Sequence, residues 1–202
     1  MDFAERLTDP SKDPVYDAIG MVPTRRSINS SWALHSLTIT NFRAGPGPRV
    51  RDMLTAQPAA VFIPSYRTDW LSEEDHSYIR GRYVPLADDF WVLGNVLHPG
   101  GGAFTAVHSG RYFIAPLEES GIAATHIESF NLLPKEPRGG SCLSTLLDGT
   151  PQNNPLVELT VGTHHIVTSA DCQPAVIWVG PNLEQVPRIG AGDHLRLFVN
   201  WY

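Results

Sequence analysis

The segment from Val61 to Gly94 constrains the fold most, because it joins a short apolar run to a strongly marked helix. The run Val61-Phe62-Ile63 is of strand type and ends at a proline. Ser72 then stands where a helix N-cap belongs, with Asp75 at the capping-box spacing and further acids in the first turn, where the helix dipole favours negative charge. The pattern predicts a strand, a loop, a helix from about Glu73 to Arg82 and another strand, which is typical of an α/β fold.

Composition narrows the class of protein. With 202 residues, 42% of them apolar, the chain is long enough to bury a substantial core. The net charge of −6 leaves no basic surface of the kind that nucleic acids bind, so we expect no nucleic-acid partner. No apolar run approaches the ~18 residues that cross a bilayer, and the first ten residues do not resemble an export signal. We therefore expect the chain to be soluble as given.

A change of pattern after Leu97 predicts a domain boundary. Pro99 is followed by three glycines, Gly100 to Gly102, which disfavour a helix or a central strand. We expect an α/β domain over residues 1–97 and an antiparallel β-sandwich of jelly-roll-like type over residues 98–202, and hence an α+β protein.

Local patterns predict the elements of each part. Before the boundary we expect, in addition to the elements above, helices over residues 3–7 and 50–57 and a strand near residues 15–16. After it, short β-branched and aromatic runs separated by turns predict strands over residues 103–107, 110–115, 157–161, 165–169, 175–179 and 195–202. Asp148-Gly149 is one of the expected turns.

Several short patterns carry a resemblance to a known family. They are Pro64-Ser65-Tyr66-Arg67, Glu74-Asp75 with Tyr78-Ile79, Arg82-Tyr83-Val84-Pro85, Trp91-Val92-Leu93-Gly94, Asp13-Pro14-Val15-Tyr16-Asp17, Arg25-Arg26 and Trp32-Ala33-Leu34-His35-Ser36. Together these patterns cover roughly residues 10–95, and this region resembles the soluble part that follows the last transmembrane helix of GT-C-type, mannosyltransferase-like membrane glycosyltransferases.

The resemblance implies a role and a location. It implies an extracytoplasmic, periplasmic C-terminal domain attached to the membrane through a parent chain that uses a lipid-linked sugar donor. In such enzymes the catalytic acid lies in an early loop of the membrane region, so the domain itself would be non-catalytic and would assist acceptor or sugar recognition. The implied partners are a sugar or lipid-linked sugar and the transmembrane part of the same parent chain.

A ligand-binding surface is the chemistry that the residues support best. Aromatic rings pack on sugar CH faces, and Arg and carboxylate side chains suit hydroxyl or phosphate groups. Four such residues follow a strand, at the edge where open α/β sheets place ligands, and three more occur in segments before it. The candidates are Tyr66, Arg67, Asp69, Trp70, Asp17, Arg26 and His35.

Other chemistries have weaker support. The histidines lack chelating spacings, since adjacent His164 and His165 would face opposite sides of a strand, and we expect neither a metal site nor a cofactor. A nucleophilic site at Ser65 with Asp75-His76, or a carboxylate pair at Asp88-Asp89 or Glu118-Glu119, would instead indicate a free-standing carbohydrate-active hydrolase. A structural or partner-binding module is the other alternative.

The two cysteines leave one question open. Cys142 and Cys172 are too few for a metal framework and lack a CxxC spacing. They are either a disulfide formed in an oxidising compartment or two buried thiols, and the sequence leaves both possibilities open.

Overall fold

The computed structural model describes residues 2–17, 22–28, 49–65, 68–87, 90–116 and 145–180, and this part of the chain forms a β-rich α+β fold. The expected mixture of helices and sheets is confirmed. None of the described helices is long and apolar enough to cross a membrane.

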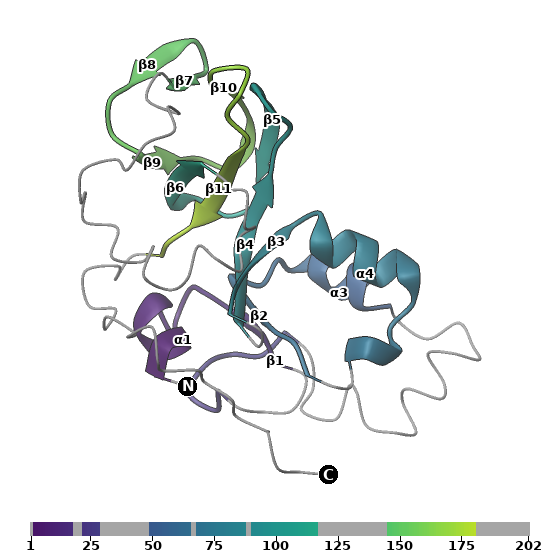
Figure 1. Cartoon of the computed structure of the whole chain (residues 1–202). Helices are drawn as coiled ribbons and strands as arrows, with labels where there is room; N and C mark the ends of the chain where they lie inside the picture. Colours follow the sequence, from purple (N-terminus) through teal and green to yellow (C-terminus); the bar gives the residue numbers. More distant parts are fainter. Residues whose placement is uncertain are drawn as a thin grey trace.

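Helices and strands follow one another along the chain as labelled in Figure 1. Their bounds are α1 (Asp2–Leu7), β1 (Val15–Asp17), α3 (Val50–Ala56), β2 (Val61–Ile63), the 3-10 turn η1 (Thr68–Trp70), α4 (Glu73–Arg80), β3 (Tyr83–Ala87), β4 (Phe90–Val96), β5 (Gly101–Ala106), β6 (Gly110–Pro116), β7 (Thr145–Leu147), β8 (Thr150–Gln152), β9 (Leu156–Leu159), β10 (Gly162–Val167) and β11 (Pro174–Trp178).

The first part of the chain contains a parallel strand pair with a helix in its crossover. Strand β1 pairs in parallel with β2, with Val15 opposite Val61 and Asp17 opposite Ile63. Parallel neighbours need a crossover connection, and here it carries α3. Helices α3 and α4 lie together on one side of these strands, and α1 lies on the other (Figure 1). The βα arrangement expected around residues 61–80 is therefore present.

Strand β4 connects this part to the rest of the molecule. Its first half pairs antiparallel with β2 and β3, whereas Gly94, Asn95 and Val96 pair with β11. The resulting sheet has the order β1-β2-β4-β11-β6-β9, with β3 attached to β4. Residues 90–96 therefore sit at the centre of the fold.

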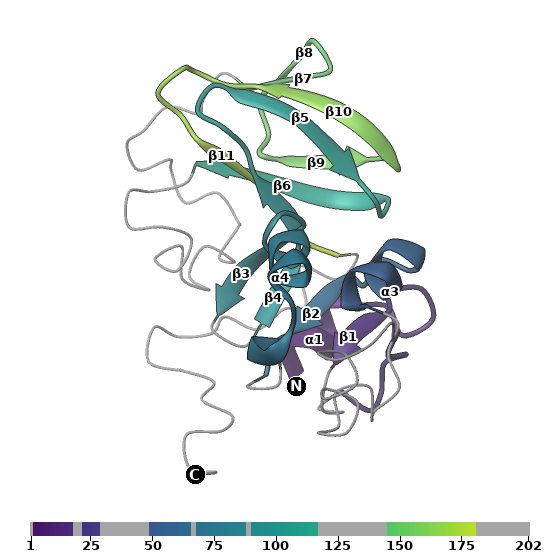
Figure 2. The same cartoon turned by 90° about the vertical axis from the view of Figure 1, so that its right-hand side faces the viewer.

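A second sheet, of order β5-β10-β7-β8, lies over the β11, β6 and β9 strands (Figure 2). Phe104 of β5 and Tyr112 of β6 meet edge to face, with ring centroids 5.5 Å apart. The β7–β8 hairpin closes through Asp148-Gly149, whose positive φ angles of 51° and 78° fit the turn that a two-residue hairpin favours. The turn expected at these residues is confirmed.

One continuous hydrophobic core runs through both parts. It includes Phe62 and Val92 in the first part and Val176, Tyr112 and Ile166 in the second, all at most 1% exposed. Because β11 pairs with β4, strands from either side of the expected boundary at residues 97 and 98 belong to one sheet. Separate folding of residues 1–97 and 98–202 stays a prediction.

Glycines permit two close approaches in this arrangement. A Cβ on Gly94 would lie 2.3 Å from the Val176 carbonyl oxygen, so only glycine lets β4 and β11 meet here. The glycine run that was predicted to end the first part instead leads into β5, which is an outer strand of its sheet. Gly101 has a φ of 101°, and a Cβ there would lie 2.1 Å from the Ile166 carbonyl oxygen.

Candidate functional site

The predicted ligand-binding edge forms only in part within the described residues. Because β1 and β2 are parallel, Asp17 and the chain after Ile63 emerge at the same edge of the sheet. The Asp17 side chain is 1% exposed, and its Oδ2 accepts a hydrogen bond from the Val22 amide at 2.6 Å. This hydrogen bond links the end of β1 to Val22, and the role of Asp17 in ligand binding stays a prediction.

Three of the remaining predicted site residues fall within the described part of the chain. Asp69 is exposed in η1, and Trp70 contributes its backbone to the same turn. Arg26 is exposed beside β1, and its backbone carbonyl accepts a hydrogen bond from the Val15 amide at 3.0 Å. Tyr66, Arg67 and His35 lie outside the described residues. Their proposed contacts with a ligand stay predictions.

The nucleophilic alternative around Ser65 lacks the hydrogen-bond geometry that it requires. His76 Nε2 lies 2.7 Å from the Thr68 carbonyl oxygen, and Nδ1 lies 3.9 Å from Glu73. The Asp75 carboxylate accepts the Ser72 hydroxyl at 2.8 Å and the Arg51 amide at 2.9 Å. A triad needs the acid to orient the histidine, and here Asp75 orients the start of α4 and α3 instead. Asp88-Asp89 and Glu118-Glu119 lie outside the described residues.

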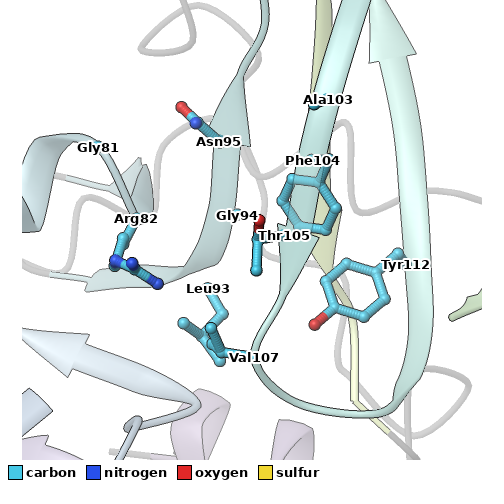
Figure 3. Close-up of a pocket in the computed structure, with 10 residues that line it drawn as sticks. All are labelled: Gly81, Arg82, Leu93, Gly94, Asn95, Ala103, Phe104, Thr105, Val107 and Tyr112. Carbon is cyan, nitrogen blue, oxygen red and sulfur yellow. The ribbon is translucent and has the colours of Figure 1, made fainter. Parts of the chain in front are cut away.

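A pocket of about 180 Å³ opens at the other end of these strands, where β4 passes beyond β2 toward β5. We call it the β4–β5 pocket. Its lining residues, drawn in Figure 3, are Gly81, Arg82, Leu93, Gly94, Asn95, Ala103, Phe104, Thr105, Val107 and Tyr112. This volume lies below the ~300–1,000 Å³ of pockets for drug-sized ligands, so the pocket suits a small ligand.

Arg82 supplies the charge of the β4–β5 pocket. It lies in the turn after α4, next to the C-cap Gly81, and its guanidinium carbon lies 4.8 Å from the centre of the Tyr78 ring, four residues earlier. The Tyr78 hydroxyl in turn accepts a hydrogen bond from Thr55 of α3 at 2.9 Å. The cation–π contact and this hydrogen bond hold the guanidinium against the two helices.

Polar groups of β4 and β5 complete the lining. Asn95 of β4 is half-buried, and none of the described residues forms a hydrogen bond with its side-chain amide. Thr105 of β5 is exposed, and its hydroxyl lies 3.4 Å from that of Thr163. Figure 3 shows Arg82 on one side of the pocket and Thr105, with the rings of Phe104 and Tyr112, on the other. The two aromatic residues are at most 5% exposed, so only small parts of their rings face the pocket.

The turn beside the pocket is fixed by an ion pair. His108, next to the lining residue Val107, places its Nε2 3.2 Å from Oδ1 of Asp13, which is 4% exposed. Tyr112 donates its hydroxyl hydrogen to the His108 carbonyl at 2.6 Å. The hydrogen bond with Asp13 raises the pKa of His108, against the opposing effect of burial. The N-terminal segment thus holds the β5–β6 turn in place.

Two further observations bear on chemistry and compartment. In the described part of the chain, no three His, Cys, Asp or Glu side chains gather as metal ligands. Cys172 is disulfide-bonded and 6% exposed, whereas Cys142 lies outside the described residues.

Sequence patterns alone do not bring the residues of the β4–β5 pocket together. Arg82 lies in the turn before β3, Asn95 in β4 and Thr105 in β5, and they meet only after β4 has paired with β3 and β11. The one local signal is the pair of Tyr78 and Arg82 at the end of a predicted helix, which places both side chains on one helix face.

Comparison with known proteins gives no match: no family model, no curated protein and no solved structure is similar to this chain.

Proposed function

We propose that this chain is a non-catalytic, extracytoplasmic domain of a membrane glycosyltransferase and that it binds a sugar in the β4–β5 pocket. The observation that carries the proposal is the pocket itself, which combines the Arg82 guanidinium, an amide without a hydrogen bond to any described residue, and a hydroxyl in a volume of about 180 Å³. Binding sites for small polar ligands use a few such convergent polar groups against an apolar wall.

The lining chemistry favours binding over hydrolysis. Glycoside hydrolysis uses two carboxyl groups that flank the scissile bond. Among the described residues that line the pocket, none carries a carboxyl group. The groups present can orient hydroxyl groups and an anionic substituent, and they provide no acid, base or nucleophile.

The covalent state of Cys172 supports the proposed location. Disulfides persist mainly in extracytoplasmic, oxidising compartments. A disulfide at Cys172 is therefore consistent with the periplasmic location that the family resemblance implies.

We infer that the strands beyond β4 form a jelly-roll-like sandwich that carries one wall of the pocket. The edge-to-face contact between Phe104 and Tyr112 supports two facing sheets, because it joins β5 of one sheet to β6 of the other. An experimental structure with these two rings in one inter-sheet core would support this arrangement.

A glycan array probed with the purified chain, followed by calorimetric titration of the glycans that bind, tests the proposed function. We expect binding of one or more glycans without turnover of sugar-lipids or aryl glycosides. Asn95→Ala should weaken binding by about 3- to 10-fold, the effect of a lost hydrogen bond.

Asn153→Ala is the matched control for this experiment. Asn153 is exposed and lines a separate groove beside β7, β8 and β10. Its substitution should leave affinity unchanged within about 2-fold, since it removes an amide far from the ligand. No binding of any glycan, or turnover by the pure chain, would overturn the proposal.

A further inference from the structure

Arg82 at the β4–β5 pocket differs from the other described arginines near α3 and α4 in its ion-pair partners. Arg49 and Arg51 both pair with Glu74, and Arg80 pairs with Glu73. Arg82 contacts the neutral Tyr78 ring, and no described carboxylate lies within ion-pair distance of it. In a chain of net charge −6, with 21 acidic against 15 basic residues, Arg82 thus has no counter-ion among the described residues.

The remaining lining residues do not neutralise this charge. They contribute the Asn95 amide, the hydroxyls of Thr105 and Tyr112, and apolar or glycine surface, and the Tyr112 hydroxyl already donates to the His108 carbonyl. An arginine guanidinium presents donors in a planar fork that matches the oxygens of carboxylate or phosphate groups. A ligand with one negative group can therefore pair with Arg82 without meeting a competing carboxylate in the pocket.

The position of the polar groups sets the class of ligand further. Arg82 lies opposite Thr105 across the pocket, and Asn95 of β4 is a third lining residue, drawn above both in Figure 3. Amide and hydroxyl groups bind sugar hydroxyls by donating and accepting hydrogen bonds. The volume of about 180 Å³ lies below the ~300–1,000 Å³ of pockets for drug-sized ligands, so it suits a single sugar ring with its anionic substituent.

We infer that the β4–β5 pocket takes a single anionic monosaccharide unit, with its carboxylate or phosphate group on the Arg82 guanidinium and its hydroxyl groups on Asn95 and Thr105. This inference deepens the proposed function and rests on it. Tyr78 acts as a positioning residue, because it holds the guanidinium through its ring face and is itself held by Thr55.

Calorimetric titration of the full chain tests this inference with four probes: glucose, glucuronate, glucose 1-phosphate and inorganic phosphate. We expect at least one of the two anionic sugars to bind about 10-fold or more tightly than glucose, the effect of a charge-assisted hydrogen bond. The two anionic arms distinguish a carboxylate from a phosphate as the recognised group. Raising the salt concentration should weaken binding of the anionic sugar more than binding of glucose.

Variants of two neighbouring arginines supply the control. Arg82→Gln should reduce the affinity for the anionic sugar by about 10-fold or more and leave the affinity for glucose within about 2-fold of the wild type. Arg80 is exposed and pairs with Glu73, so Arg80→Gln should change neither affinity. Tyr78→Leu should reduce the affinity for the anionic sugar alone, and by less than Arg82→Gln does. Arg82→Lys keeps the positive charge and should therefore retain part of the affinity that Arg82→Gln loses.

The possible outcomes separate this inference from the proposed function. Equal affinity for glucose and the anionic sugars, unaffected by Arg82→Gln, would overturn the inference and leave sugar binding intact. Binding of inorganic phosphate without any sugar would overturn both and make the pocket a simple anion site. No binding of any of the four probes would overturn the inference, and glycan binding on the array would then decide the proposed function separately.

Discussion

At the residue scale, the contact between His108 and Asp13 joins segments that are far apart in the sequence. Asp13 is almost fully buried and also accepts the Asp9 amide at 2.7 Å, so its carboxylate is held in place from the N-terminal side. His108 packs on Trp178, with ring centroids 5.6 Å apart. The pair therefore links the segment between α1 and β1 to the β5–β6 turn and to β11.

This contact predicts a pH dependence of stability. The hydrogen bond with Asp13 raises the pKa of His108 in the folded protein above that in the unfolded chain, which is about 6.5. The stabilisation is complete below the unfolded pKa and is lost as the pH rises through the folded pKa. Chemical denaturation from about pH 5 to about pH 9, a range that includes the ordinary histidine pKa, measures the free energy of unfolding. We expect this free energy to fall less steeply with rising pH in His108→Gln than in the wild type.

His164 provides an internal comparison for that experiment. Its hydrogen bond with Asp148, at 2.8 Å, raises the pKa of His164 in the same direction. His164→Gln should remove a separate part of the decrease in the free energy of unfolding with rising pH. In the double variant, this free energy should depend less on pH than in either single variant. If the slope is the same in the wild type and in His108→Gln, the contact with Asp13 does not contribute to stability as we infer.

At the element scale, the start of α4 shows a cap that sequence alone identifies. Ser72 Oγ accepts the Asp75 amide hydrogen at 3.1 Å and donates to the Asp75 carboxylate at 2.8 Å. Asp75 also accepts the Arg51 amide, so the cap fixes α4 relative to α3. The same cap therefore helps to orient the helix that ends at the pocket.

Removing this cap should cost measurable stability. Ser72→Ala is expected to lower the free energy of unfolding by about 1 kcal/mol, because the Asp75 amide loses its partner. Ser77 lies exposed in the middle of the same helix, and Ser77→Ala should be neutral or stabilise by up to about 0.5 kcal/mol, since alanine favours helix. Thermal and urea unfolding of both variants check the prediction. Equal effects at the two positions would mean that the cap is not important for stability.

Local signals explain which elements the sequence predicts and which it does not. The capped helix, the strand at Val61–Ile63 and the Asp148-Gly149 turn depend on neighbouring residues and are confirmed. The segment from Tyr83 to Val96 was expected to hold one strand but forms two, β3 and β4. Residues 92–94 are buried without alternation because β4 lies inside the sheet, so periodicity gives little signal there.

The candidate site was less predictable than the elements. Its groups come from the turn before β3, from β4 and from β5, and strand pairing decides that Arg82, Asn95 and Thr105 line one pocket. Asp17, by contrast, ends the strand that the sequence predicts near residues 15–16. Its carboxylate accepts a backbone amide there, and composition does not distinguish such a role from ligand binding.

At the scale of the whole molecule, β11 makes the two expected parts depend on each other. It lies between β4 and β6, and all five of its residues are buried. Trp178, at its end, is 1% exposed. A chain ending near residue 97 would leave β4 without this neighbour and would expose apolar side chains of the shared core.

The shared sheet predicts a single cooperative unfolding transition for the full chain. We expect calorimetric unfolding to show one transition, and residues 1–97 produced alone to lack a folded near-ultraviolet circular dichroism signal. The division expected from the sequence predicts two transitions and a folded fragment instead. The same two measurements decide between these descriptions.

The central claim is that the β4–β5 pocket is the sugar-binding site, and backbone amide shifts test it most directly. In a ¹⁵N-labelled sample titrated with a sugar that binds on the array, we predict the largest shift changes at Arg82, Gly94, Asn95 and Thr105. The opposite edge of the sheet, represented by Asp17 and Asp69, should change little. Shifts concentrated around Asp17 and Asp69, with the pocket residues unmoved, would contradict the claim.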